Sequence, residues 1–205
     1  MHAAIVAALA QRGYAVTPDA LPASTIDGLR DRACELDSAG ALAAAHVGHA
    51  QGRVARADIR GDRIAWLGAP QTAAERHFVQ WLEALRIACN RELFLGLTQF
   101  EGHYALYPAG AAYTRHRDRF RDDDARVLSC VLYLNDRWTG SDGGALRLHV
   151  DSISPVDVLP EGGTFVAFLA ADFDHEVLVA SRERLSLSGW FRRRARGTAV
   201  LECPP

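Results

Sequence analysis

Three residues in the second half of the chain have the types and spacing of metal ligands. His116 and Asp118 are two positions apart, so on a strand their side chains would lie on the same face. His175 follows a predicted strand and a short turn at 171–174, from which it could complete the set across a barrel. Two histidines and one carboxylate form the facial triad of non-haem iron(II) sites, which leaves three coordination positions open. The sequence therefore predicts an iron(II) site at which a cosubstrate and dioxygen can bind side by side.

An arginine nine residues after His175 extends this hypothesis. The strand predicted over 184–193 has an apolar face, and its other face carries Arg184, Ser186, Ser188 and Trp190. An unpaired charge inside a barrel costs several kcal/mol, so an inward arginine is expected to meet an anion. Arg184 can bind a carboxylate through two parallel hydrogen bonds, and Tyr133 could add a phenolic donor. We therefore expect a dicarboxylate cosubstrate at this position.

The elements that would hold these residues are strands. From Gln99 onward apolar residues alternate with a period of two, and Gly, Pro, Asn and Asp clusters separate the runs. The predicted strands cover 99–107, 126–134, 145–150, 156–159, 164–170 and 184–193. Short strands without intervening helices predict a sandwich or a jelly-roll barrel.

The first half of the chain is predicted to be mainly helical. We expect helices at about 2–11, from the cap signal at 24–27, and from a Thr72/Glu75 capping box to about Asn90, with strands at 14–17 and 58–67. Residues 38–56 have no clear period and are interpreted as a mobile loop. The whole chain, 1–205, is predicted to be one domain, in which 1–95 form helical support and a substrate loop and 96–195 form the β core.

Composition disfavours several classes of protein. The net charge of −2 is spread along the chain, which gives no basic patch for nucleic acid or an anionic membrane. The apolar opening at 1–13 is too short to span a bilayer and lacks the basic start of a secretory signal. The four cysteines, at positions 34, 89, 130 and 203, form no C-x-x-C pair and are expected to be reduced thiols, as in a cytoplasmic protein. The oligomeric state is left open.

Several motifs together resemble a known family. They are D-I-R-G-D-R-I-A-W-L at 58–67, Y-P at 107–108, Y-T-R-H-R-D at 113–118, Y-L-N-D-R-W at 133–138, G-G-A-L-R-L at 143–148 and H-E-V at 175–177, followed by Arg184. In this order the chain resembles the prolyl hydroxylase branch of the 2-oxoglutarate oxygenases, which includes the hypoxia-inducible-factor prolyl hydroxylases and bacterial relatives. The resemblance implies an α+β, mainly β fold, namely a double-stranded β-helix (jelly roll) buttressed by N-terminal helices.

The resemblance also implies roles for individual residues. The iron(II) ligands would be His116, Asp118 and His175, and the distal carboxylate of 2-oxoglutarate would meet Arg184 and Tyr133. The cosubstrate pocket would include Tyr107 and Ser188, and the peptide side would include Arg126, Trp190, Arg60 and Asp62. Dioxygen would be the second cosubstrate, with ascorbate as an optional addition.

The implied substrate is a prolyl residue in an exposed loop of a cytoplasmic protein, and elongation factor Tu is a candidate because bacterial relatives act on it. The chain departs from its eukaryotic relatives at 119–125 and in the loop before Asp58, two regions expected near the substrate. The same chemistry on another side chain or a small molecule therefore stays open. A jelly-roll binding module or a zinc hydrolase would leave Arg184 without a role. His46 and His49 are disfavoured as a second metal pair because no carboxylate or cysteine stands at ligand spacing.

Overall fold

The computed structural model describes residues 1–45, 56, 59–119, 125–150 and 154–194. Its helices are α1 (His2–Arg12), α2 (Ala23–Ser38) and α3 (Ala73–Leu93). Its strands are β1 (Tyr14–Thr17), β2 (Ala43–Ala44), β3 (Arg63–Trp66), β4 (Gln99–Tyr107), β5 (Tyr113–His116), β6 (Arg126–Tyr133), β7 (Leu146–His149), β8 (Val156–Val158), β9 (Phe165–Leu169), β10 (Asp174–Val177) and β11 (Arg184–Arg192).

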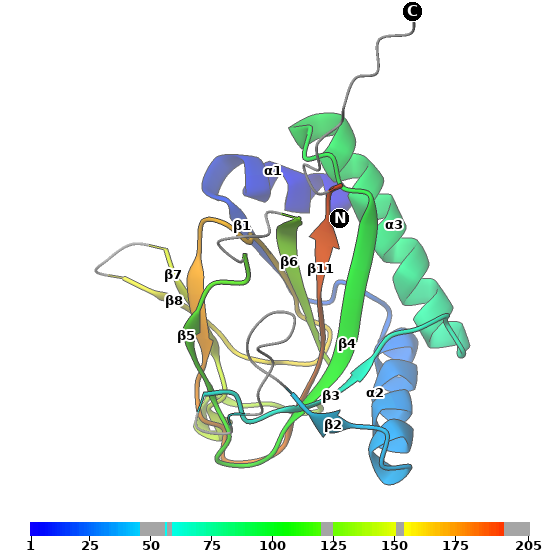
Figure 1. Cartoon of the computed structure of the whole chain (residues 1–205), viewed down its shortest axis with the longest axis vertical. Helices are drawn as coiled ribbons and strands as arrows, with labels where there is room; N and C mark the ends of the chain where they lie inside the picture. Colours follow the sequence, from blue (N-terminus) through cyan, green and yellow to red (C-terminus); the bar gives the residue numbers. More distant parts are fainter. Residues whose placement is uncertain (46–55, 57–58, 120–124, 151–153, 195–205) are drawn as a thin grey trace, which may run out of the picture.

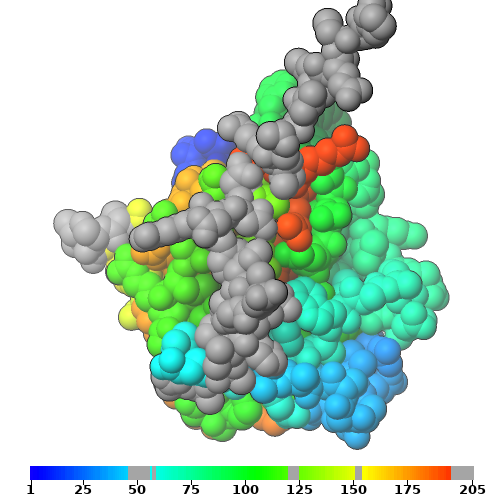
Figure 2. All heavy atoms as spheres, viewed as in Figure 1, coloured from blue at the N-terminus to red at the C-terminus, as the bar shows by residue number. Residues whose placement is uncertain are grey.

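The strands form two antiparallel sheets. The larger has the order β1-β9-β6-β11-β4-β3-β2, and the smaller has the order β5-β10-β7-β8. In Figure 1 the smaller sheet lies on the left, with α3 and α2 on the right and α1 at the top. The space-filling view in Figure 2 shows the helices α2 and α3 on the right flank of the same face. The predicted jelly roll with supporting helices is confirmed, although residues before 96 also add β1, β2 and β3 to the larger sheet.

Alternation along the strands sends apolar residues to both faces of the larger sheet, where they form the two largest hydrophobic clusters among the described residues. One face of the larger sheet packs against the helices through residues such as Leu9 of α1, Leu29 of α2 and Leu85 of α3. The opposite face packs against the smaller sheet, where Phe168 meets Leu148 and neighbouring apolar residues. The fold therefore has three layers, and the space between the two sheets is where a site can form.

Strand β11 runs through the middle of the larger sheet, paired with β4 on one side and β6 on the other. Its Leu187 and Phe191 belong to the core beneath the helices. Its Arg184 and Ser186 are buried as well, at 2% and 1% exposure, but they lie on the opposite face. The predicted polar inner face of this strand is therefore present.

The two predicted helix starts have different outcomes. The Thr72/Glu75 capping box at the start of α3 is confirmed. The cap signal at 24–27 is wrong, because α2 begins at Ala23 after Pro22, and no side chain caps it. The Thr25 hydroxyl instead lies 2.8 Å from Nδ1 of His77, a contact that links α2 to α3.

The single strand predicted over 58–67 is also wrong in extent. Arg60 forms an isolated bridge with Tyr113 of the smaller sheet, whereas β3 begins at Arg63 and belongs to the larger one. The chain crosses between the sheets at Gly61, where an added Cβ would lie 2.9 Å from Cβ of Ala111. This crossing interrupts the strand. Residues 46–55 of the predicted loop, including His46 and His49, lie outside the described residues, as do residues 57–58.

The described residues include three of the four cysteines and three α-helices. Cys34, Cys89 and Cys130 are free thiols, and Cys203 lies outside the described residues. Among the residues with defined positions, no helix has the length and apolar character needed to cross a bilayer.

Candidate metal and cosubstrate site

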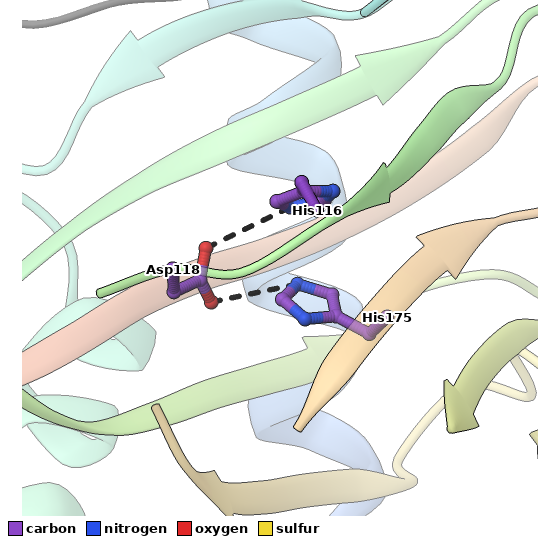
Figure 3. Close-up of side chains that lie close together, drawn as sticks. All are labelled: His116, Asp118 and His175. Atoms are coloured by element: carbon purple, nitrogen blue, oxygen red, sulfur yellow. Dashed lines mark ion pairs between the residues drawn. The ribbon is translucent and has the colours of Figure 1, made fainter. Parts of the chain in front are cut away.

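Strands β5 and β10 bring the three candidate ligands together. His116 is the last residue of β5 and is the cross-strand partner of His175 in β10, while Asp118 lies in a bend just beyond β5. Potential ligand atoms of all three residues lie within 4.8 Å of one another. Nε2 of His116 is 3.7 Å from Oδ1 of Asp118, and Nε2 of His175 is 3.5 Å from Oδ2 (Figure 3). This arrangement could hold one metal ion on a single face of its coordination sphere.

Backbone and aromatic contacts hold the two imidazoles with Nε2 facing the carboxylate. Nδ1 of His116 donates to the Thr114 carbonyl at 2.8 Å, and Nδ1 of His175 approaches the Phe173 carbonyl at 3.5 Å. The His116 ring also stacks on Tyr113, with ring centroids 3.6 Å apart. A proton on Nδ1 leaves the Nε2 lone pair free, which is the form that a metal requires.

The electrostatics around Asp118 and His116 favour protonation states that suit a metal ion. Burial raises the pKa of Asp118, but His175, His116 and hydrogen bonds from Ser129 and Trp190 outweigh burial and bring that pKa to about 2. Burial, followed by the charge of His175, lowers the pKa of His116 to about 4. At neutral pH the site therefore presents an ionised carboxylate and a neutral His116 imidazole.

Ser129 of β6 is a positioning residue for Asp118. Its hydroxyl donates to Oδ2 of Asp118 at 2.7 Å. We expect Ser129→Ala to weaken iron(II) binding about 10-fold, because partners behind a ligand typically contribute about 10- to 100-fold to metal affinity. An iron titration would measure this, with Ser181→Ala as the control, since the hydroxyl of the exposed Ser181 donates to the Asp142 carbonyl, away from the candidate ligands. Equal affinity in wild type and Ser129→Ala would show that the contact does not orient the carboxylate.

Arg184 is 2% exposed and lines the cavity that the three candidate ligands also line. Its Nε donates to the Gly144 carbonyl at 2.9 Å, and its guanidinium carbon lies 5.0 Å from the centre of the Tyr133 ring and 5.3 Å from that of Tyr107. Within the described part of the chain, no carboxylate pairs with this guanidinium, and no group accepts a hydrogen bond from the O–H of the buried Tyr133. An anionic ligand with oxygen atoms could pair with this buried guanidinium and accept a hydrogen bond from the phenolic O–H.

Gly144, which the sequence marks only as a turn residue, makes room for Arg184. Its φ of 70° lies in the left-handed region, and an added Cβ would lie 3.3 Å from Cδ of Arg184 and 2.9 Å from Cβ of Ala180. A side chain at this position would therefore strain the turn and push against the stem of the arginine.

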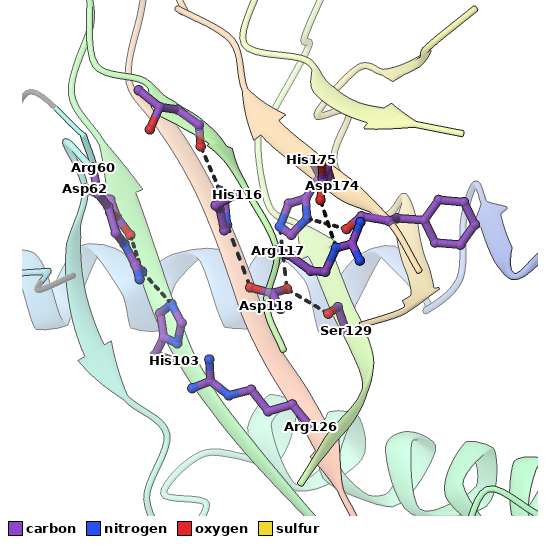
Figure 4. Close-up of polar contacts among 12 residues, drawn as sticks. Arg60, Asp62, His103, His116, Arg117, Asp118, Arg126, Ser129, Asp174 and His175 are labelled. Carbon is purple, nitrogen blue, oxygen red and sulfur yellow. Dashed lines mark hydrogen bonds and ion pairs between the residues drawn. The ribbon is translucent and has the colours of Figure 1, made fainter. Parts of the chain in front are cut away.

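One cavity collects most of the residues predicted for cosubstrate and substrate. Besides the three candidate ligands and Arg184, its lining includes Arg60, Asp62, Tyr107, Ser188 and Trp190. Arg60 pairs with Asp62 through two hydrogen bonds of 2.7 and 2.9 Å, and its side chain is 12% exposed. Figure 4 shows this pair on one side of the candidate ligands.

Arg126 does not line the cavity but supports its wall. Its guanidinium carbon lies 3.5 Å from the centre of the Trp190 ring, and its Nε donates to Glu101 at 2.9 Å. Arg126 and Trp190, which were both predicted on the peptide side, therefore contact each other, and Glu101 is an additional partner that sequence reasoning missed.

The sequence predicts no function for three further residues of the site. Ser129 and Tyr113 contact the candidate ligands, and His103 lines the cavity at 2% exposure. The two-residue period of β4 and β6 could have indicated which face of each strand carries His103 and Ser129. Nothing in the sequence fixes the register that brings either of them to this cavity.

The comparisons with known proteins agree with this geometry. Residues 102–192 match the 2OG-Fe(II) oxygenase superfamily. The crystal structure of a Pseudomonas putida prolyl-4-hydroxylase is similar over 95% of this chain and 100% of that one, with 45% identity and a TM-score of 0.85. The chain belongs to the 2OG-Fe(II) oxygenase superfamily. Within this superfamily, human prolyl hydroxylase EGLN3 is 26% identical over 91% of this chain and 81% of its own length.

A further similar structure is a prolyl hydroxylase from Trichoplax adhaerens in complex with a hypoxia inducible factor oxygen degradation domain peptide fragment. It is 26% identical, with a TM-score of 0.84, and the match covers 93% of this chain and 88% of that one. The oxygenase described here is thus a prolyl hydroxylase-like enzyme of the 2OG-Fe(II) superfamily, as the sequence predicts.

Proposed function

We propose that this oxygenase hydroxylates a prolyl residue of a protein substrate, with iron(II) held by His116, Asp118 and His175, and that it converts 2-oxoglutarate and dioxygen to succinate and carbon dioxide. The observation that carries the proposal is the combination of the ligand cluster with a buried arginine that lacks a carboxylate partner among the described residues. A metal-binding module would have no use for the second feature.

The residues present fit both groups. Two imidazole nitrogens and one carboxylate oxygen are suitable donors for iron(II) and leave adjacent positions open. When bound, iron(II) supplies the activation of dioxygen that organic side chains cannot provide. Arg184 and Tyr133 would bind the distal carboxylate of 2-oxoglutarate, which fixes the direction in which the cosubstrate points.

The walls of the cavity would perform the remaining tasks. Phe168, Leu146 and Val177 are apolar lining residues of the cavity and would exclude water from a bound cosubstrate. Tyr107 and Ser188 belong to the larger sheet and line the same cavity as Arg184 and Trp190. Trp190, backed by Arg126, would present a flat apolar face to the prolyl ring.

A protein substrate is supported by two observations. The Trichoplax relative is described with a peptide bound, and the segment with Arg60 and Asp62, which resembles the peptide side of the family, lines the same cavity here. Elongation factor Tu is the first substrate that we propose to test, on the basis of the resemblance to bacterial relatives.

The test is mass spectrometry of candidate proteins after incubation with the enzyme, iron(II) and 2-oxoglutarate, with and without ascorbate. We expect a gain of one oxygen that fragmentation assigns to proline, with succinate formed in equal amount. Oxygen assigned reproducibly to another side chain, or only to a small metabolite, would contradict the prolyl substrate and leave the cosubstrate proposal standing.

A further inference from the structure

One buried polar side chain in the cavity has no task in the proposed iron and cosubstrate site. His103 of β4 is 2% exposed and lines the cavity that the three candidate ligands share. Its ring lies between two indoles, with centroid distances of 5.1 Å to Trp66 of β3 and 5.5 Å to Trp190 of β11. Figure 4 shows the ring on β4 with Arg60 on one side and Arg126 on the other.

The contact with Arg60 determines which nitrogen of His103 carries the proton. Nη2 of Arg60 lies 3.3 Å from Nε2 of His103. Because a guanidinium can only donate, Nε2 must accept, and the proton of the neutral ring is therefore on Nδ1. Burial, followed by the charges of Arg60 and Arg126, lowers the pKa of His103 to about 3, so the ring is neutral at physiological pH.

The resulting Nδ1–H group is a buried donor without an acceptor. Among the residues whose positions are described, none accepts a hydrogen bond from Nδ1 of His103. Leaving such a donor unsatisfied costs about 1–3 kcal/mol, so a ligand that offers an acceptor here would regain that free energy.

The charges around His103 favour a neutral acceptor. Arg60 is compensated by two hydrogen bonds to Asp62, and Arg126 is compensated by its bond to Glu101. With both cations paired and the imidazole neutral, this side of the cavity has no excess positive charge with which to attract a carboxylate. An amide carbonyl matches it better.

A prolyl peptide has such an acceptor in excess. Proline lacks an N–H, so the peptide bond before it has a carbonyl without a matching donor. We propose that His103 is a positioning residue for the protein substrate, whose Nδ1–H donates a hydrogen bond to a backbone carbonyl next to the target proline. This inference rests on the proposed function and adds the group that would fix the depth and orientation of the peptide.

Three substitutions separate the two ring nitrogens. In His103→Asn the side-chain amide nitrogen stands as many bonds from Cα as Nδ1 does, so a donor is retained at that position. In His103→Gln the amide stands where Nε2 was, which preserves the contact with Arg60 and removes the Nδ1 donor. His103→Phe retains a ring between the two indoles and removes both nitrogens.

The measurement is the KM for synthetic peptides that each carry one central proline, with the dissociation constant of 2-oxoglutarate on the iron-loaded protein measured in parallel. We expect the peptide KM to rise about 10-fold in His103→Gln and His103→Phe and to stay within about two-fold of wild type in His103→Asn. The dissociation constant of 2-oxoglutarate should change less than the peptide KM in each variant. Histidine nitrogen NMR should show a proton on Nδ1 of His103 whose resonance shifts when the peptide is added.

The outcomes distinguish failure of this inference from failure of the proposed function. If the wild type hydroxylates a peptide and the three variants have equal KM values, or if His103→Asn is impaired as much as His103→Gln, the role of Nδ1 is refuted and the proposed function stands. A proton found on Nε2 would likewise refute it. If the wild type hydroxylates no proline in any peptide, both the proposed function and this inference fall.

Discussion

His175→Ala is expected to abolish turnover of 2-oxoglutarate while the fold is retained. Structural zinc sites with four ligands bind with about 10–16 kcal/mol, so the loss of one of three ligands should cost about 3–4 kcal/mol, or about 100- to 1000-fold in metal affinity. Iron content, succinate formation and the circular dichroism spectrum would be measured together. His116→Ala should behave in the same way, because the two rings are cross-strand partners.

His149→Ala provides a matched control for these two variants. His149 ends β7, next to β10, and is paired with Glu176 at 3.1 Å, outside the cavity lining. It should bind iron and turn over 2-oxoglutarate as the wild type does. Succinate formation at wild-type rates in both His116→Ala and His175→Ala would show that the ligand assignment is wrong.

Arg184→Leu is expected to weaken binding of 2-oxoglutarate and leave iron content nearly unchanged. The lost contact would be a charge-assisted, bidentate hydrogen bond in a buried position, where removal costs about 2–4 kcal/mol, or about 30- to 1000-fold in affinity. Calorimetry on the iron-loaded protein measures this change directly, and the thermal midpoint reports any damage to the fold.

Arg182→Leu is the control for the arginine. This residue is close in sequence, but its Nη2 donates to the carbonyls of Asp136 and Arg137 at the surface. It should leave the affinity for 2-oxoglutarate unchanged. An unchanged affinity in Arg184→Leu with intact folding would remove the main argument for a dicarboxylate cosubstrate.

The prediction of the β core succeeded where residue types alternate strictly. Strands β4, β6 and β11 are long, and their apolar residues face one core with a period of two, so the predicted strands 99–107, 126–134 and 184–193 agree with the structure to within one residue at each end. The same alternation places Arg184 on the inner face of its strand.

Predictions that depend on contacts between distant segments were weaker. The sequence does not predict strand β10, because four residues give too short a pattern, although pairing with β5 and β7 makes it a strand. The crossing of the chain at Gly61 depends on Ala111, and the position of Ser129 beside Asp118 depends on how a bend meets β6. The local sequence does not predict such contacts between segments that are distant along the chain.

The candidate metal ligands and the candidate anchor of the cosubstrate belong to different sheets. His116 and His175 lie in the four-stranded sheet, and Arg184 lies in the seven-stranded one. The distance between the two ends of the cosubstrate is therefore set by the thickness of the apolar layer that contains Phe168 and Leu146. Because such a layer is close-packed, an oxo diacid with one carbon more or fewer could reach both ends only if the sheets moved. Selectivity for chain length is thus expected to be a property of core packing, and it would change with core substitutions that touch neither the metal nor the arginine.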